Sequence, residues 1–186
     1  VRPGGLPIEQ GVAVFNVETV YNVYRAVEEK QPVTDKYVSV VAEVSDPVTV
    51  RVPLGCTLEE VVAQAGNTTV KDPVYFVGGP MMGRAMVNLA SPVTKGCSGI
   101  TVLSGAEARR GAESACIKCA KCVQACPMGL EPYLLSKLSR KELWERLEGE
   151  EVTSCIECGC CQSTCPSYLP LLDWVRLGKQ TVMGLI

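Results

Sequence analysis

Two short cysteine-rich segments constrain this chain more than any other feature of its sequence. One reads CIKCAKCVQACP, from Cys116 to Pro127, and the other reads CIECGCCQSTCP, from Cys155 to Pro166; together they hold nine of the eleven cysteines. Aligned on their first cysteine, both fit C-x2-C-x2-C-x3-C-P, the run that holds [4Fe–4S] clusters in bacterial ferredoxins. The two segments therefore predict two [4Fe–4S] clusters.

The same pattern predicts which cysteine serves which cluster. Thiolates at i, i+3 and i+6 reach three irons of one cubane, while the cysteine before the proline ligates the other cluster. We therefore expect a crossed assignment, with a cluster A and a cluster B. Cluster A would use Cys116, Cys119, Cys122 and Cys165, and cluster B would use Cys155, Cys158, Cys161 and Cys126.

Zinc and disulfides are the competing interpretations of these cysteines. Zinc ribbons separate two cysteine pairs by a dozen or more residues, whereas four in-frame cysteines here lie within eleven positions. Disulfide scaffolds belong to small secreted chains, and this one has enough apolar residues to build a core. The absence of histidine excludes Cys2His2 zinc, Rieske centres, His-ligated haem and Ser-His-Asp catalysis. We expect a reducing, cytosolic compartment.

Three cysteines lie outside the two frames. Cys160 aligns with Lys121, which is not a ligand position, so we expect a small residue beside the cluster; a rescue ligand or redox-active thiol is the alternative. Cys56 and Cys97 each follow a glycine in a predicted turn and should be incidental. Charges also differ between the frames: Lys118 and Lys121 lie in the first, and Glu157 lies in the second. Cluster A should then have the higher potential, unless solvent screens these charges.

The first part of the chain, residues 1–35, predicts a strand over residues 12–17 and a helix over residues 18–30. Apolar residues recur there at helical spacing and predict one buried face, formed by Val20, Val23, Tyr24 and Val27. A strand that feeds a helix without a partner strand suggests the tail of an upstream α/β domain. The opening VRPGGLPIEQ has neither an initiator Met nor the layout of a signal peptide, so we expect a fragment.

Residues 36–104 predict an α+β domain. β-branched runs of strand length occupy residues 37–44, 48–54, 74–78 and 99–104. Between the second and third of these, residues 57–66 predict a helix with Thr57 as N-cap, Glu60 at the third position and Gly66 as C-cap. Two strands, one helix and further strands are the order of a β-grasp fold.

Residues 105–186 predict a helical domain that carries the cysteines. Helical patterns cover residues 108–115, 131–148 and 169–186. An apolar face is expected on the middle helix, formed by Leu134, Leu135, Leu138, Leu143 and Leu147. The formal charge of −2 gives no case for nucleic-acid binding, and no apolar run approaches the ~18 residues of a membrane span.

A glycine-rich stretch, FVGGPMMGRAM at residues 76–86, matches no phosphate-binding motif. Gly78 and Gly79 should supply special backbone angles, while Met81, Met82 and Met86 should pack. A partner-docking or cofactor-lid role is the alternative.

GGPMMG, SPVTKGCSGITVL, the two cysteine segments and LPLLDWVRLGK together resemble the C subunit of the Rnf electron transport complex. The resemblance implies a β-grasp domain of the SLBB type followed by an α-helical ferredoxin domain with two [4Fe–4S] clusters, held by the same eight cysteines. It also implies an upstream domain that binds FMN and NADH. The helical linker is similar to that in the iron–sulfur protein of succinate dehydrogenase. The family usually has Thr at the position of Cys97 and often no cysteine at Cys160, in keeping with both being non-ligands.

The function that the resemblance implies is electron relay in an ion-translocating ferredoxin:NAD⁺ oxidoreductase. The protein would lie peripherally on the cytoplasmic face of the bacterial inner membrane, without a span of its own. Its partners would be the other subunits and, through the complex, a ferredoxin-type donor. No catalytic residue is expected, and the isolated chain should carry electrons without oxidising NADH.

Two other functions compete with this one. The first is a soluble iron–sulfur reductase, such as a cobalamin reductase or the electron-transfer protein of an amino-acid reductase. We expect domain order to discriminate, because the cobalamin reductase type should place its clusters before the β-grasp domain. The second is a docking module whose clusters only stabilise the fold.

Overall fold

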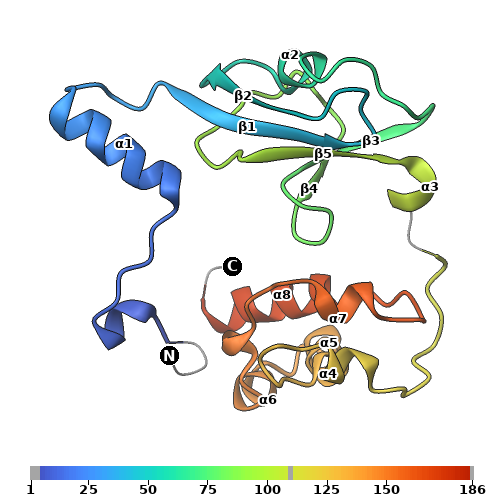
Figure 1. Ribbon diagram of the computed structural model, residues 1–186. Coiled ribbons are helices and arrows are strands. Elements are labelled where there is room, and N and C mark those ends of the chain that lie inside the picture. The colour runs from blue at the N-terminus through green and yellow to red at the C-terminus, as the bar shows by residue number, and fades with distance from the viewer. Residues whose placement is uncertain (1–4, 109–110, 185–186) are drawn as a thin grey trace. The chain divides into compact units, whose positions relative to one another are not determined.

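The computed structural model describes residues 5–108 and 111–184 (Figure 1). The chain divides into two compact units, Ala13–Arg109 and Val1–Val12 with Arg110–Ile186. No helix within the described residues is long and apolar enough to cross a membrane.

A five-stranded mixed sheet forms the centre of the first unit. Its strands are β1 (Asp35–Ala42), β2 (Val48–Pro53), β3 (Pro73–Val77), β4 (Arg84–Met86) and β5 (Gly99–Ser104). Their order is β2-β1-β5-β3-β4, and β1 pairs with β5 in parallel while the other pairs are antiparallel. The four predicted strands are confirmed, and the short β4 was not predicted.

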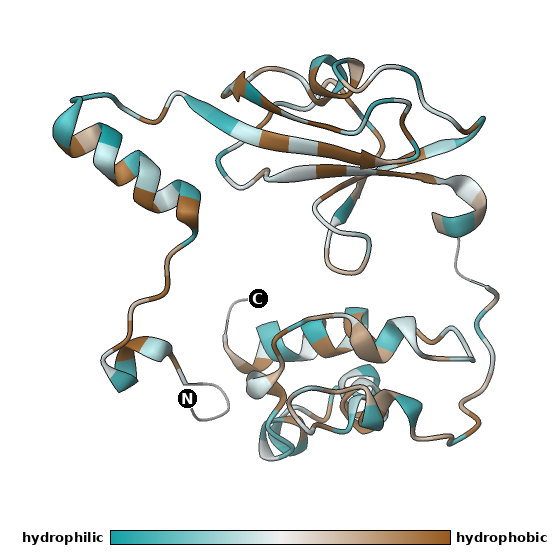
Figure 2. Ribbon diagram, viewed as in Figure 1, coloured by the Kyte–Doolittle hydropathy of each residue, from teal (hydrophilic) through white to brown (hydrophobic). Residues whose placement is uncertain are grey.

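One face of this sheet is covered and the other is open. In β1, Val38 and Val40 are fully buried, while Tyr37 and Val41 on the opposite face are exposed. This alternation of buried and exposed side chains follows from the period of two along a strand. Figure 2, which is coloured by hydropathy, shows hydrophobic segments along β1. The covered face packs against helix α2 (Leu58–Ala63) in a core of apolar residues: Val38, Val40, Val44, Val52, Leu58, Val61, Val62, Ala65, Val93, Cys97, Ile100 and Val102.

The capping residues of α2 are those that the sequence predicts at its start but not at its end. The Thr57 side chain accepts from the Glu60 amide at 3.2 Å, and the Glu60 carboxylate accepts from the Thr57 amide at 2.8 Å. This reciprocal capping box satisfies two of the free N–H groups of the first turn. The C-cap is Gln64 rather than Gly66, which lies beyond the helix with a φ of +75°.

The predicted strand over residues 12–17 is wrong. Residues 12–16 have no regular structure, and helix α1 (Val17–Glu28) begins at the last residue of the predicted strand. A strand needs a partner for its backbone groups, and no described strand pairs with this segment.

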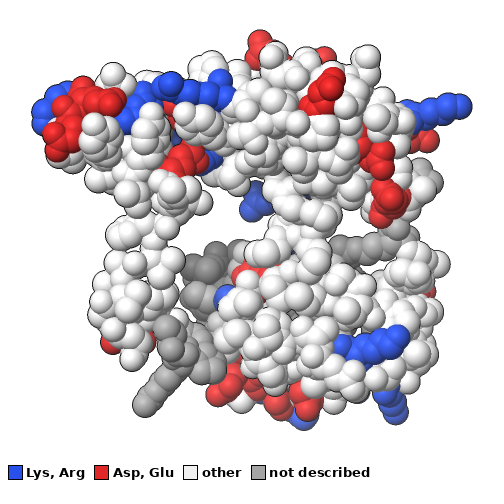
Figure 3. Space-filling model, viewed as in Figure 1, with Lys and Arg blue, Asp and Glu red and all other residues white. Residues whose placement is uncertain are grey.

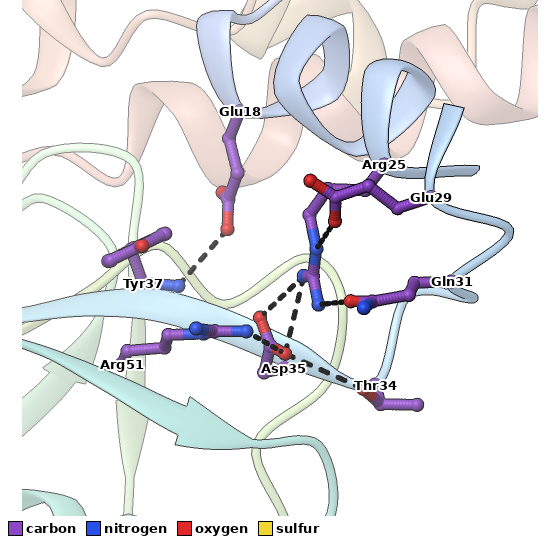
Figure 4. A network of polar contacts seen from close by, with 8 residues as sticks. All are labelled: Glu18, Arg25, Glu29, Gln31, Thr34, Asp35, Tyr37 and Arg51. Atoms are coloured by element: carbon purple, nitrogen blue, oxygen red, sulfur yellow. Dashed lines mark hydrogen bonds and ion pairs between the residues drawn. The ribbon is translucent and has the colours of Figure 1, made fainter. Parts of the chain in front are cut away.

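Helix α1 is confirmed as a helix, but its buried face is not the predicted one. The side chains of Val20, Val23, Tyr24 and Val27 are all more than half exposed. The buried residue is Arg25, whose guanidinium donates to Asp35 at 3.1 Å and to Gln31 at 2.8 Å (Figure 4). Polar contacts therefore attach α1 to the start of β1, and its apolar face remains exposed.

The second unit is helical. It contains the 3-10 helix η1 (Pro7–Gln10), α4 (Lys121–Gln124), α5 (Pro132–Arg140), α6 (Trp144–Gly149), the 3-10 helix η2 (Val152–Ser154), α7 (Cys160–Ser163) and α8 (Leu171–Val182). The helix predicted over residues 131–148 is thus two helices. Its apolar face is partly confirmed: Leu135, Leu138 and Leu147 are buried and Leu134 packs beside them, but Leu143 caps α6 and is exposed.

The other predicted helices of this region have mixed outcomes. Helix α3 (Gly105–Ala108) belongs to the sheet unit, and residues 111–115, predicted as helix, have no regular structure. Residues 109–110 and 185–186 of the predicted helices lie outside the described residues. Within residues 169–184, helix α8 is confirmed.

The second unit is an internal repeat that extends well beyond the cysteines. With one constant offset in residue number, α4 corresponds to α7, and Pro132 at the start of α5 corresponds to Leu171 at the start of α8. The equivalent residues Ser139 and Gly178 meet where α5 packs against α8. At that contact the Ser139 hydroxyl donates to the Trp174 carbonyl at 2.7 Å. Each half is therefore a cysteine loop, a short helix, a Cys-Pro turn and a longer helix.

Candidate metal centre

The two cysteine loops have the same backbone conformation at equivalent positions. Lys118 and Glu157 follow the first cysteine by two residues, and both have a φ of +56°. Ala120 and Gly159 follow it by four, with φ of +58° and +81°. Left-handed residues in such turns direct successive N–H groups toward a concavity that binds anions, as in many iron–sulfur sites. Both loops therefore suit a negatively charged cluster.

The structure groups the eight predicted ligands around two cavities, four and four. One cavity, of about 980 Å³, is lined by Cys116, Cys119, Cys122 and Cys165. The other, of about 20 Å³, is lined by Cys126, Cys155, Cys158 and Cys161. In each cavity, three cysteines of one loop lie with the last cysteine of the other loop. The ligand sets themselves stay a prediction.

Basic side chains of α8 hold the second loop. Arg176 Nε lies 2.7 Å from Glu157 Oε2, and Lys179 Nζ lies 3.5 Å from the other carboxylate oxygen. Lys179 also donates to the Cys155 carbonyl at 2.6 Å, and the Glu157 amide donates to Cys155 Sγ at 3.4 Å. The negative charge that the sequence places in this loop is thus compensated by two cations that sequence reasoning missed. These two cations lie on a helix that follows the second cysteine segment, and no sequence pattern linked them to the loop.

The first loop has different surroundings. Lys118, Lys137, Arg140 and Lys141 all line its cavity, and Glu113 is the acidic residue among the described lining residues. Arg140 lies 3.4 Å from Glu113 and 5.4 Å from the centre of the Trp174 ring. The mouth of this cavity is therefore predominantly positive.

Burial disfavours bare thiolates in both cavities. It raises the pKa of Cys161 to about 12, with the nearby Cys155 and Cys158 adding to the effect. Burial likewise raises the pKa of Cys155 and of Cys122. Such thiols ionise when a bound cation compensates their charge. The cavities therefore fit a metal centre better than a set of free catalytic thiolates.

Cys160 lies where the alignment places it, at the first residue of α7, as Lys121 is the first residue of α4. It is not among the cysteines that line either cavity. A hydrogen bond with Cys158 raises the pKa of the Cys160 thiol. Cys97 is buried in the core of the sheet unit and Cys56 packs against it, so both are packing residues of that unit.

The glycine-rich stretch forms the β3–β4 turn, and one part of its predicted packing is wrong. Met86 packs against the core, but Met81 and Met82 are exposed at the turn. Gly78 has a φ of +98°, as expected for a residue with special backbone angles. A Cβ at Gly83 would lie 2.8 Å from the Val77 carbonyl oxygen, so this turn closes too tightly for a side chain.

Comparison with known proteins decides the class of the cysteine region. Residues 109–166 match the 4Fe-4S dicluster domain family. This region is a 4Fe–4S dicluster domain. The iron–sulfur interpretation of the two cysteine segments is thereby confirmed at the level of the domain.

The relatives of the whole chain are longer proteins. It is 37% identical over 152 residues to the C subunit of the proton-translocating ferredoxin:NAD⁺ oxidoreductase complex of Clostridium ljungdahlii, covering 81% of this chain and 33% of that relative. It is 32% identical over 185 residues to the C subunit of the Na⁺-translocating complex of Acetobacterium woodii, covering 99% and 42%. The resemblance to the C subunit of such complexes is confirmed, over less than half of the length of each relative.

Cobalamin reductase PduS of Citrobacter freundii is also similar, at 41% identity over 148 residues, covering 73% of this chain and 33% of the reductase. The prediction that domain order separates the two classes stays a prediction.

Proposed function

We propose that this chain relays single electrons through two [4Fe–4S] clusters within a larger oxidoreductase. The observation that carries the proposal is the grouping of eight cysteines around two cavities, each completed by the last cysteine of the other loop. When bound, a [4Fe–4S] cluster supplies reversible one-electron chemistry. Cysteines that alternate between the loops would keep the two clusters close together.

The proposed ligand sets are those that the alignment predicts. Cys116, Cys119, Cys122 and Cys165 would hold cluster A, and Cys155, Cys158, Cys161 and Cys126 would hold cluster B. Within the described residues, no three Cys, Asp or Glu side chains lie close enough to hold a single metal ion. A cubane takes one thiolate on each of four irons, so its ligands are farther apart than those around a zinc ion.

The surrounding residues of the chain would orient the ligands and set their electrostatics. The Glu157 amide donates to Cys155 Sγ, and Lys179 fixes the carbonyl of the same cysteine. Apolar side chains, among them Leu135, Leu172 and Val175, line the second cavity and limit water there. Hydrogen bonds to sulfur and limited solvent are the means by which a protein tunes a cluster potential.

We further propose that the sheet unit is a β-grasp domain of the SLBB type. The sheet order β2-β1-β5-β3-β4, with parallel central strands and α2 between β2 and β3, supports this assignment. The proposed domains are residues 1–35, 36–104 and 105–186. The exposed apolar face of α1 supports a larger protein in which residues 1–35 close an α/β domain that binds FMN and NADH.

The larger protein that we propose is the C subunit of an ion-translocating ferredoxin:NAD⁺ oxidoreductase. It would lie peripherally at the cytoplasmic face of the bacterial inner membrane, with the other subunits and a ferredoxin-type donor as partners. The match over 99% of this chain to the Acetobacterium woodii relative supports this choice. The higher identity to cobalamin reductase PduS favours cob(II)alamin reduction as the second candidate.

Anaerobic iron and sulfide analysis with EPR tests the relay. We expect about eight irons and eight sulfides per chain, and two interacting S = 1/2 signals after reduction with dithionite. A single zinc per chain, or clusters that no reductant reaches, would overturn the proposal. The purified chain should not oxidise NADH, because no flavin or nicotinamide site is expected within it.

A second measurement separates the two candidate enzymes. The complete protein from the same gene should be assayed with reduced ferredoxin and NAD⁺, and separately with NADH and cob(II)alamin. Turnover with the first pair alone supports the ferredoxin:NAD⁺ enzyme, and turnover with the second pair alone supports the cobalamin reductase.

A further inference from the structure

The repeat allows the charges around the two loops to be compared position by position. Lys118 in the first loop is equivalent to Glu157 in the second, and Lys137 and Arg140 on α5 are equivalent to Arg176 and Lys179 on α8. In the second half, Glu157 lies between both cations of α8. The first half has the same two cations on its helix, but a third cation stands where the carboxylate would be.

Three of the four cations that line the first cavity have no side-chain partner among the described residues. Among the residues that the structure describes, no hydrogen bond or ion pair engages the side chains of Lys118, Lys137 or Lys141. Arg140 pairs with Glu113, although both side chains are about half exposed, at 48% and 47%. Unpaired charges of one sign at a concave surface create a potential that attracts a partner of the opposite sign.

Apart from Glu113, the acidic residues that the structure describes in this unit do not line this cavity. Five of them occupy the short segment that includes α6, namely Glu142, Glu145, Glu148, Glu150 and Glu151. On the face drawn in Figure 3, acidic side chains gather along the lower edge of this unit, with some basic side chains beside them. The cavity lined by four cations thus has one acidic lining residue, Glu113, although the charges of the unit nearly balance.

The same cavity mouth also offers accessible apolar surface and accessible cysteines. Of the eleven cysteines, only Cys116 and Cys119 are exposed. Between them, Ile117 is 67% exposed, and Tyr133 across the cavity is 42% exposed. Apolar and aromatic residues surrounded by a charged rim are typical of a transient protein–protein interface.

We propose that the mouth of the first cavity is the docking surface for a small acidic electron-carrier protein. Carboxylates of that protein take, against Lys118, Lys137 and Arg140, the place that Glu157 takes against Arg176 and Lys179. Across this contact one electron passes between the carrier and cluster A, so that one is oxidised as the other is reduced, and no proton moves. This electron transfer rests on the proposed relay function, whereas the docking itself rests on the charges alone.

The test introduces at position 118 a carboxylate like that of Glu157 in the second loop. In Lys118→Glu the new side chain can pair with Lys137 and Arg140, and the backbone should accept it because Glu157 has the same φ. The probe is an oxidised, acidic bacterial ferredoxin with two [4Fe–4S] clusters, titrated by calorimetry at low salt. We expect Lys118→Glu to weaken binding ~10-fold, and the doubly substituted Lys137→Gln, Lys141→Gln chain to weaken it several-fold.

The matched control is Arg146→Glu on α6, which makes the same change of charge away from the cavity and should bind as the unchanged chain does. Equal binding by Lys118→Glu and the unchanged chain, equal weakening in the control, or no ferredoxin binding at any salt would each overturn the docking proposal. Iron content and dithionite reduction are measured on the same samples. If the clusters are reduced but binding does not depend on charge, the docking proposal fails and the relay proposal is kept. If binding depends on charge but the clusters are not reduced, the relay proposal fails and the docking proposal is kept.

Discussion

The two halves of the cysteine unit have the same backbone conformation but different surroundings. Both loops place left-handed residues at the same positions, and both begin a short helix at the same place. In the second loop the acidic residue is paired, whereas the cavity of the first loop is larger and is lined by four cations, of which Arg140 has an ion pair among the described residues. The comparison indicates that a cluster site fixes the backbone, while the side chains around it are free to take different roles.

The largest effect should come from removing a cysteine that is in frame. Cys161→Ser should lose cluster B and lower the iron content from about eight to about four per chain, because serine is a poor ligand for this cluster. Cys160→Ser, its neighbour, should keep both clusters, since Cys160 occupies the position of Lys121. Iron analysis and EPR on anaerobically prepared chains measure both. The reverse result would show that the repeat has been aligned one residue out of register.

A substitution at the contact between α5 and α8 should have the next largest effect. A Cβ at Gly178 would meet Leu147 and lie 2.8 Å from Ser139 Oγ, so Gly178→Ala should force α8 away from α5. Overpacking of this kind costs about 1–3 kcal/mol. Because Arg176 and Lys179 flank Gly178, the displacement should disturb the second loop more than the first.

Anaerobic guanidinium unfolding, followed by cluster absorbance, measures this loss. Gly149→Ala is the matched control, because a Cβ there would meet nothing within 4 Å. It should leave the midpoint unchanged or raise it slightly. If Gly178→Ala were as stable as this control, the close packing of α5 against α8 would not determine the stability of this unit.

The potentials of the two clusters should respond to different cations. Lys179→Gln removes a charge beside the second loop and should lower the potential of cluster B by about 50 mV, close to a tenfold change in a one-electron equilibrium. Lys118→Gln should lower the potential of cluster A in the same way. EPR-monitored titrations measure each cluster separately. A shift confined to the wrong cluster would contradict the assignment of the first three cysteines of each loop to one cluster.

These pairings also bear on the expected order of the two cluster potentials. The sequence places two lysines in the first loop and one glutamate in the second, which predicts a higher potential for cluster A. Since Arg176 and Lys179 both approach Glu157, the local charge around the second loop is not negative. Because Lys137 and Arg140 occupy the equivalent positions of the first half, the loop residues still distinguish the clusters, and cluster A is still expected to have the higher potential.

Sequence was a good guide to this molecule where a pattern is local. The four strands of β-branched residues and the Thr57–Glu60 capping box depend on residues a few positions apart, and the structure has them as predicted. The spacing of the frames also anticipated which cysteines share a cavity.

Sequence patterns failed to predict burial and contacts that depend on residues far apart in the chain. The apolar face of α1 has the spacing of a buried face, yet the helix is attached by Arg25 to Asp35, an ion pair that periodicity does not register. Met81 and Met82 are exposed because a tight turn directs them away from the core. Arg176 and Lys179 contact the second loop from α8, and no local pattern of the sequence specifies these contacts.

The smallest predicted effect concerns a position where the two loops differ in the free-energy cost of their left-handed backbone conformation. Ala120 has the left-handed conformation that Gly159 supplies in the second loop, and this conformation costs an L-residue roughly 1–2 kcal/mol. Ala120→Gly should therefore raise the free energy of unfolding by about 0.5 kcal/mol, after the greater freedom of glycine in the unfolded chain is subtracted. Ala125→Gly is the matched control, because Ala125 has a φ of −82° and should lose stability on the same change. Shifts of the guanidinium unfolding midpoint in opposite directions for the two variants would show that the left-handed residue is strained in the first loop. Equal losses would show that the Ala120 methyl group contributes packing that outweighs the strain.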